Sequence, residues 1–127
     1  MILAMAGTAF PDDLRAAQTR LHQAASELAA LLRTPPWSVE SLPGRPGTQH
    51  PHTGEVTGGR ERSPGWTRDQ QDAVRRLRRE CTDLSARITT HPFWSTVEAE
   101  QRVPTRTELK QVTKAAVAAA LGITEAA

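Results

Sequence analysis

Residues 12–33 read DDLRAAQTRLHQAASELAALLR, and small apolar residues return in this stretch every three or four positions. The recurring residues are Leu14, Ala17, Leu21, Ala24, Leu28 and Leu31. On a helix with 3.6 residues per turn these positions share one face, so the spacing predicts an amphipathic α-helix. Asp12 and Asp13 suit the positive end of its dipole, and Pro35 and Pro36 prevent its continuation.

Two later stretches, residues 67–90 and 105–121, repeat the same spacing. The first carries Val74, Leu77, Cys81, Leu84 and Ile88, and the second carries Leu109, Val112, Ala116 and Ala119, followed by Ile123. Each stretch opens with a threonine three residues before Gln or Glu, namely Thr67 with Gln70 and Thr105 with Glu108. This arrangement is typical of a capping box, in which the two residues bond each other's backbone amides. Gly122 suits a left-handed end to the last helix.

Residues 41–65 have a different character. They hold six of the eight glycines and four of the nine prolines, while Leu42 and Val56 are their only sizeable apolar residues. Such a segment buries too little apolar surface to offset the entropy lost on ordering. We therefore expect a long disordered loop here, with a functional loop as the alternative.

These elements predict an all-α fold in a single domain of 127 residues. The first two helices would form an antiparallel hairpin, with the third, C-terminal helix packed against it and the disordered loop joining the first two. This geometry brings Trp37 near Trp66 at the loop side, and Phe10 against Phe93 or Trp94 at the other side. Because the spacing resembles that of a coiled coil and leaves apolar surface over, a homodimer is a further hypothesis.

Composition narrows the class of protein. Aromatic residues make up only 4% of the chain, which favours packed helices over a sheet. Cys81 is the only cysteine, so an internal disulfide is excluded and a reducing compartment is favoured. The apolar stretch 1–10 lacks a basic segment and is too short for a signal peptide or a membrane span, so we expect a cytoplasmic protein that does not enter membranes.

No recognisable catalytic, cofactor-binding or metal site emerges from the sequence, and we expect no enzyme. There is no Ser/His/Asp order and no glycine fingerprint for a dinucleotide. His50 and His52 form a His-x-His pair, but only Glu55 is placed to help them, so we expect no metal site. Cys81 occupies an apolar stripe and is expected to be a small buried residue. His22 lies outside its stripe and is expected to be solvated.

The remaining candidates are tryptophans and basic residues that could contact a partner. They are Trp37, Trp66, Trp94, Arg75, Arg78, Arg79, Lys110 and Lys114. Tryptophans at helix ends commonly fill a core, and they also serve as anchors in interfaces. The basic residues either form solvated helix faces or bind an acidic protein or phosphates, although the net charge of +2 does not by itself imply a polyanion.

The sequence favours a non-enzymatic protein–protein interaction module, such as an adaptor, an accessory subunit or a small regulatory subunit. The alternative is a nucleic-acid-binding accessory protein that uses the basic faces of the second and third helices. That alternative lacks support from any groove-reading motif in the sequence.

Overall fold

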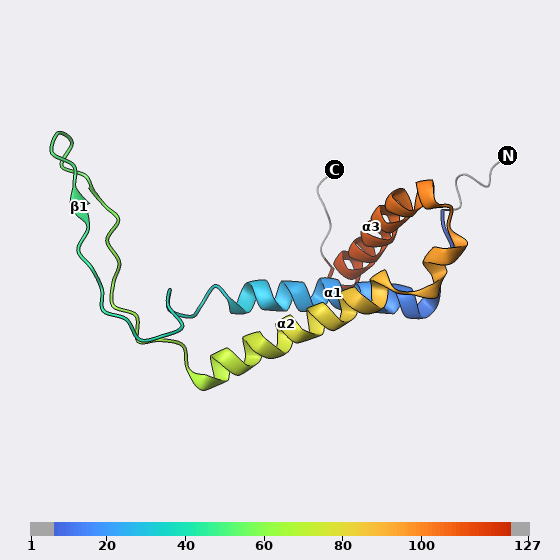
Figure 1. Cartoon of the computed structure of the whole chain (residues 1–127), viewed down its shortest axis with the longest axis horizontal. Coiled ribbons are helices and arrows are strands. Elements are labelled where there is room, and N and C mark those ends of the chain that lie inside the picture. The colour runs from blue at the N-terminus through green and yellow to red at the C-terminus, as the bar shows by residue number, and fades with distance from the viewer. Residues whose placement is uncertain (1–6, 123–127) are drawn as a thin grey trace. The chain divides into compact units, whose positions relative to one another are not determined.

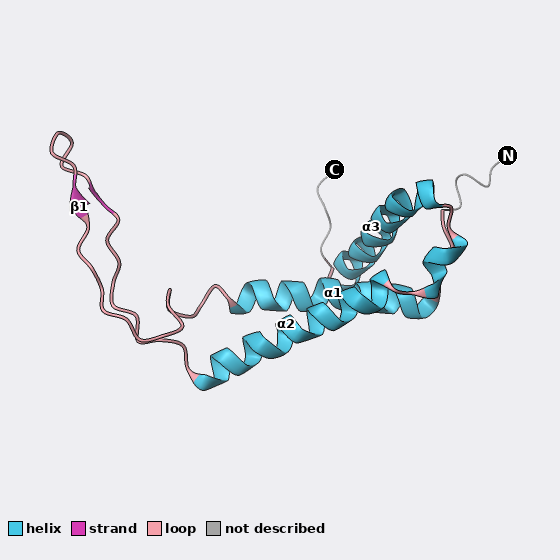
Figure 2. Cartoon of the chain, viewed as in Figure 1, coloured by secondary structure: helices cyan, strands magenta, loops and turns pink. Residues whose placement is uncertain are grey.

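The computed structural model describes residues 7–122, so Ile123 lies outside the described part. Three α-helices make up most of it: α1 (Asp12–Leu31), α2 (Arg68–Thr89) and α3 (Arg102–Ala120). Two short 3-10 helices, η2 (Pro92–Thr96) and η3 (Ala99–Gln101), connect α2 to α3. Two strands, β1 (Thr48–Gln49) and β2 (Val56–Thr57), lie between α1 and α2 (Figure 2). The three predicted helices are therefore confirmed, but the strands mean that the chain is not purely α-helical.

The chain divides into two compact units. The first, which we call the helical unit, comprises Met1–Leu28 and Leu77–Ala127. The second, the β-hairpin unit, comprises Ala29–Arg76. Because α1 and α2 each contribute residues to both units, the antiparallel hairpin of two full-length helices stays a prediction.

The core of the helical unit contains residues of the predicted stripes of α1 and α2, but from the stripe predicted for α3 it contains only Leu109. The prediction that Val112, Ala116 and Ala119 share the buried face is wrong, since all three are exposed. The buried members of the core are Phe10, Leu14, Ala17, Leu84, Ile88, Trp94 and Leu109. The rings of Phe10 and Phe93 lie 5.6 Å apart, which confirms the contact predicted for this end of the helices. Trp94 packs edge-on against Phe93 at 5.3 Å and donates a 2.6 Å hydrogen bond from its Nε1 to the carbonyl of Ile88.

Polar contacts add to this core. The guanidinium of Arg20 on α1 bonds both carboxylate oxygens of Glu80 on α2, at 2.6 and 2.7 Å. His91 caps η2 by accepting the amide of Phe93 at its Nδ1, and its Nε2 lies 2.9 Å from the carboxylate of Asp13. With Nδ1 acting as acceptor, the ring proton is on Nε2, which donates a hydrogen bond to the carboxylate of Asp13.

One predicted capping box is confirmed and the other is wrong. At the start of α2, the amide of Thr67 bonds Gln70 at 2.8 Å and the amide of Gln70 bonds the hydroxyl of Thr67 at 3.1 Å. α3 instead begins at Arg102, before Thr105. Pro104 lies in its first turn, where a proline is tolerated. Glu108 is used elsewhere: it accepts the amide and the hydroxyl of Thr8 at 2.7 and 3.0 Å.

In the β-hairpin unit, the segment between α1 and α2 forms two arms that run side by side to a turn at the tip (Figure 1). Antiparallel bridges join Leu42 to Ser63 and Arg45 to Arg60, and β1 pairs with β2 beyond them. The prediction of a disordered loop over 41–65 is not confirmed, since the structure places a hydrogen-bonded ladder there.

The glycines explain how the two arms come so close. A Cβ atom added to Gly59 would lie 2.7 Å from the backbone nitrogen of Gly47, and one added to Gly44 would lie 2.7 Å from the carbonyl oxygen of Arg60. Any larger residue would collide with the facing backbone at these positions. Here glycine permits close contact between the two arms, so the glycines are not the sign of disorder that composition suggests.

No helix within residues 7–122 has the length and apolar character needed to cross a membrane.

Candidate functional site

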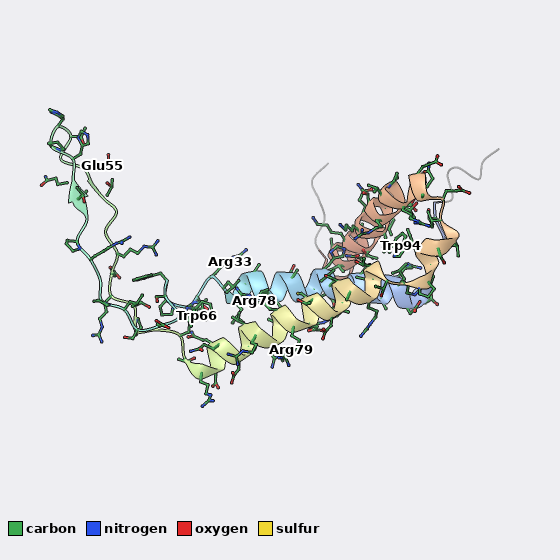
Figure 3. All side chains as sticks on the ribbon, in the orientation of Figure 1. Arg33, Glu55, Trp66, Arg78, Arg79 and Trp94 are labelled. Atoms are coloured by element: carbon green, nitrogen blue, oxygen red, sulfur yellow. The ribbon has the colours of Figure 1, made fainter. Side chains whose placement is uncertain are left out.

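The structure places the three tryptophans in different environments. Trp94 is only 7% exposed and belongs to the core of the helical unit, and its burial argues against a role in partner binding. Trp66 is half-buried at the base of the β-hairpin unit (Figure 3), where its Nε1 donates to the carbonyl of Pro36 at 2.7 Å. Trp37, the next residue along from Pro36, is 44% exposed. Trp37 is therefore the tryptophan most available to a partner.

The side chain of Trp37 is held in place although it is exposed. Its Nε1 donates a 2.7 Å hydrogen bond to the carbonyl of Glu61 on the opposite arm. The guanidinium carbon of Arg60 lies over its ring, 4.9 Å from the ring centre. A cation at this distance is attracted by the negative face of the indole. The ring is thus fixed on both its edge and one face.

Trp37 lines an open pocket of about 500 Å³ in the β-hairpin unit. The other lining residues are Leu42, Pro43, Arg45 and Arg60. The pocket therefore combines an apolar floor with two guanidinium groups. We call these five residues the Trp37 pocket.

Arg45 and Arg60 stand opposite each other in the ladder. The amide of Arg45 bonds the carbonyl of Arg60 at 2.9 Å, and the amide of Arg60 bonds the carbonyl of Arg45 at 3.0 Å. Among residues 7–122, neither guanidinium forms an ion pair. Their charges are available to a ligand.

The candidate basic residues of the helices differ in whether they form ion pairs. Arg75 forms an ion pair of 3.3 Å with Asp72. Arg78 and Arg79 project from α2 (Figure 3), and Lys110 and Lys114 lie one turn apart on α3. All four are exposed, and none forms an ion pair within the described ranges. Arg75 belongs to the β-hairpin unit and the other four to the helical unit.

His22 is half-buried, so the prediction that it is solvated is wrong. Its Nε2 lies 2.9 Å from the hydroxyl of Thr113 and 3.2 Å from the carbonyl of Lys110 on α3. Burial lowers the pKa of His22, and the positive charges of Lys114 and Lys110 lower it further, against the opposing effect of the carbonyl bond. The sequence alone could not show this contact, because the partners lie far along the chain.

Two other pKa shifts in the helical unit follow mainly from side-chain hydrogen bonds. The hydrogen bond from His91 lowers the pKa of Asp13. Bonds from Arg20 to Glu80, and then to Glu27, raise the pKa of the arginine. Both groups are solvent-accessible and serve to connect helices, since their contacts are with other structural residues.

Metal ligands do not gather in the described residues: no three His, Cys, Asp or Glu side chains lie close enough together to hold an ion. His50 and His52 have ring centres 5.8 Å apart at the tip of the β-hairpin unit. The Nδ1 of His50 is occupied by the amides of His52 and Thr53, which stabilises the turn. Cys81 is half-buried, less than the sequence predicts.

Most of the Trp37 pocket is not predicted from the sequence. Trp37 is among the partner-binding residues predicted there, whereas Leu42, Pro43, Arg45 and Arg60 are not. A usable signal was present in the three Pro-Gly pairs at 43–44, 46–47 and 64–65, which are typical of turns rather than of unstructured chain. Which residues of the two arms face each other is visible only in the three-dimensional structure.

These features describe a small, mostly helical protein with an exposed aromatic and basic pocket on a β-hairpin. Residues 13–112 match the family described as a domain of unknown function, DUF8825, and the chain belongs to that family. No curated protein and no solved structure matches the chain.

Proposed function

We propose that the chain is a non-enzymatic protein–protein interaction module, and that the β-hairpin unit supplies its contact surface. Two large apolar side chains of this unit, Trp37 and Leu42, are exposed and line the same pocket. A group of exposed apolar residues is the usual mark of a binding surface, whereas single ones are common on any protein.

The observation that carries the proposal is the fixed and exposed indole of Trp37. Its Nε1 is bonded to Glu61, and Arg60 stacks on its ring. A tryptophan ordered before binding loses little side-chain entropy in the complex, so most of its buried area contributes to affinity. The two arms of the ladder also form only a two-stranded sheet, which is marginally stable by itself and gains from a covering partner.

A capture experiment from the native host tests this proposal. The tagged full-length chain is compared with Trp37→Ala and with Val56→Ala, which removes an exposed apolar group outside the Trp37 pocket. We expect a protein partner that is retained at moderate salt, lost with Trp37→Ala and kept with Val56→Ala. Retention of the same proteins by all three forms, or of none, would contradict the proposal.

A second candidate is a nucleic-acid-binding accessory function through the helical unit. It is supported by the four exposed basic residues Arg78, Arg79, Lys110 and Lys114, which form no ion pair within residues 7–122. Binding through phosphates falls steeply as salt rises. The double variant Lys110→Glu, Lys114→Glu should then abolish binding to a single-stranded oligonucleotide, and salt-insensitive or unchanged binding would rule out this candidate.

The homodimer is a further part of the proposal. Val103 on α3 and Leu121, directly after its end, are 74% and 70% exposed and offer apolar area for a second copy of the helical unit. Light scattering that gives a mass of two chains at high concentration would support it, and a mass of one chain would contradict it.

A further inference from the structure

We propose that the Trp37 pocket is a binding site for an acidic peptide segment, in which a carboxylate lies next to an apolar side chain. This inference rests on the proposed function and deepens it, because it names the chemistry of the partner. Three features of the pocket carry it: the facing arginines, the stacked arrangement of one of them, and the apolar floor.

The two facing arginines repel each other, and a bound anion would relieve this repulsion. Because Arg45 and Arg60 exchange both backbone hydrogen bonds, they are directly opposite in the ladder, and both line the same pocket. Opposite residues in an antiparallel pair have Cβ atoms about 5 Å apart, and like charges at that distance destabilise the pair. No carboxylate of the described chain pairs with either one. A bound carboxylate replaces this repulsion by two favourable contacts.

The guanidinium of Arg60 is already oriented for such a ligand. It stacks on Trp37 at 4.9 Å, an arrangement that uses the flat face of the group. Its N–H bonds point outward at the edges and stay free for a forked bond with a carboxylate. Since Trp37 is itself held by Glu61, the position of this fork is set before the ligand arrives.

The floor of the pocket selects a neighbouring apolar side chain. Trp37, Leu42 and Pro43 contribute apolar surface beside the two arginines. A volume of about 500 Å³ is within the usual range of ligand pockets and accommodates one or two side chains. An acidic residue followed or preceded by leucine or an aromatic residue therefore fits both parts.

A peptide suits the pocket better than a nucleic acid does. Nucleic-acid backbones are bound by a track of cations that follows successive phosphates. Residues 29–76 contain seven arginines and five acidic residues, and Glu61 lies next to Arg60 in the chain. The pocket offers two cations and three apolar groups, which match a short acidic and apolar segment.

Fluorescence anisotropy with the full chain tests the inference. The probe is a fluorescein-labelled short peptide of alternating glutamate and leucine. It is compared with a glutamine–leucine peptide, a glutamate–serine peptide and a single-stranded thymidine oligonucleotide. We expect the glutamate–leucine peptide to bind, and each of the two altered peptides to bind roughly tenfold more weakly, as expected for loss of charge-assisted bonds or of apolar burial.

Three variants of the chain locate the site. Arg45→Gln should weaken binding of the glutamate–leucine peptide roughly tenfold, and Arg45→Lys should weaken it less, because the charge remains while the fork is lost. Arg62→Gln is the control: it removes an exposed arginine of the opposite arm that does not line the pocket, and it should bind like the wild type. The side chain of Arg45 makes no hydrogen bond or ion pair in residues 7–122, so its loss should preserve the fold.

The inference is overturned if Arg45→Gln and Arg62→Gln bind the peptide equally, if the glutamine–leucine peptide binds as tightly, or if the oligonucleotide binds more tightly than the peptide and loses that binding in Arg45→Gln. The capture experiment separates this failure from that of the proposed function. A partner that depends on Trp37 but is indifferent to Arg45→Gln overturns the acidic specificity alone. The lack of any partner that depends on Trp37 overturns the proposed function itself.

Discussion

Replacing Ser63 by alanine tests whether a specific polar contact holds the two arms of the β-hairpin unit. Ser63 is 0% exposed, and its hydroxyl donates to the carbonyl of Ser38 at 3.0 Å and accepts the amide of Gly65 at 3.2 Å. Its own amide and carbonyl pair with Leu42, each at 3.0 Å. Alanine keeps the backbone pair and removes both side-chain bonds.

The size of the effect follows from these two bonds. A neutral intramolecular hydrogen bond contributes about 1 kcal/mol net, and a buried group left without a partner costs about 1–3 kcal/mol. Because the substitution removes one oxygen atom, the cavity it leaves is small. We expect a loss of about 2 kcal/mol in the free energy of opening the arms, a roughly thirtyfold change in the opening equilibrium.

Amide hydrogen exchange measures this loss locally. Where reclosing is fast, exchange rates follow the equilibrium population of the open form, so the amides of Leu42 and Ser63 should exchange roughly thirtyfold faster in Ser63→Ala. Those around Leu14 in the helical unit should not change. Ser41→Ala is the control, since Ser41 is exposed and its hydroxyl has no hydrogen bond in the described residues. Unchanged exchange in Ser63→Ala, or an equal acceleration in Ser41→Ala, would refute the reasoning.

Three other predictions concern the core, the close approach of the arms and pH. Leu14→Ala removes a fully buried side chain and should lower the free energy of unfolding in urea by about 2–5 kcal/mol, against less than about 1 kcal/mol for the half-exposed Leu32→Ala; equal losses would contradict the core assignment. Gly59→Ala should destabilise the arms by about 1–3 kcal/mol, because its Cβ meets the backbone of Gly47, and wild-type exchange rates in this variant would show that the arms do not approach so closely. The lowered pKa of His22 means that the unfolded state takes up the proton first, so stability should fall as the pH drops below about 6.5, and this slope should flatten in His22→Gln. The same slope in His22→Gln as in the wild type would assign the effect to another group.

The helices could be predicted because their signals are local. Leu14 and Leu84 recur within stripes whose spacing matches the helical repeat, and both lie in the core. The capping box of Thr67 and Gln70 depends on residues three positions apart, and the structure contains both of its bonds. The contact of Phe10 with Phe93 followed from the position of aromatic residues at the ends of the stripes.

The failures concern contacts between distant residues. Glu108 bonds Thr8 and does not cap a helix at Thr105. The tertiary fold brings the amide of Thr8 within hydrogen-bond distance of this carboxylate, although the two residues are far apart in the sequence. His22 was expected in solvent, yet α3 covers it through Thr113. Neither outcome has a signal in the neighbouring sequence.

The β-hairpin unit shows how composition can mislead. Glycine weakens a chain entropically when it is solvated, but it also allows two backbones to approach where a Cβ would collide. Gly47 and Gly59 are in the second situation. Composition does not distinguish solvated glycines from glycines at a close backbone contact. For this reason Trp37 is the only residue of the Trp37 pocket that the sequence predicts as a binding residue.

Nuclear Overhauser spectroscopy of the full chain tests most directly whether residues 41–65 form the ladder that presents Trp37. The account predicts cross-strand contacts between the amide protons of Arg45 and Arg60 and between those of Leu42 and Ser63, because each pair exchanges two backbone hydrogen bonds. It also predicts slow exchange of the indole N–H of Trp37, which is bonded to Glu61. Random-coil shifts throughout this segment, with no contact between the two arms, would contradict the account.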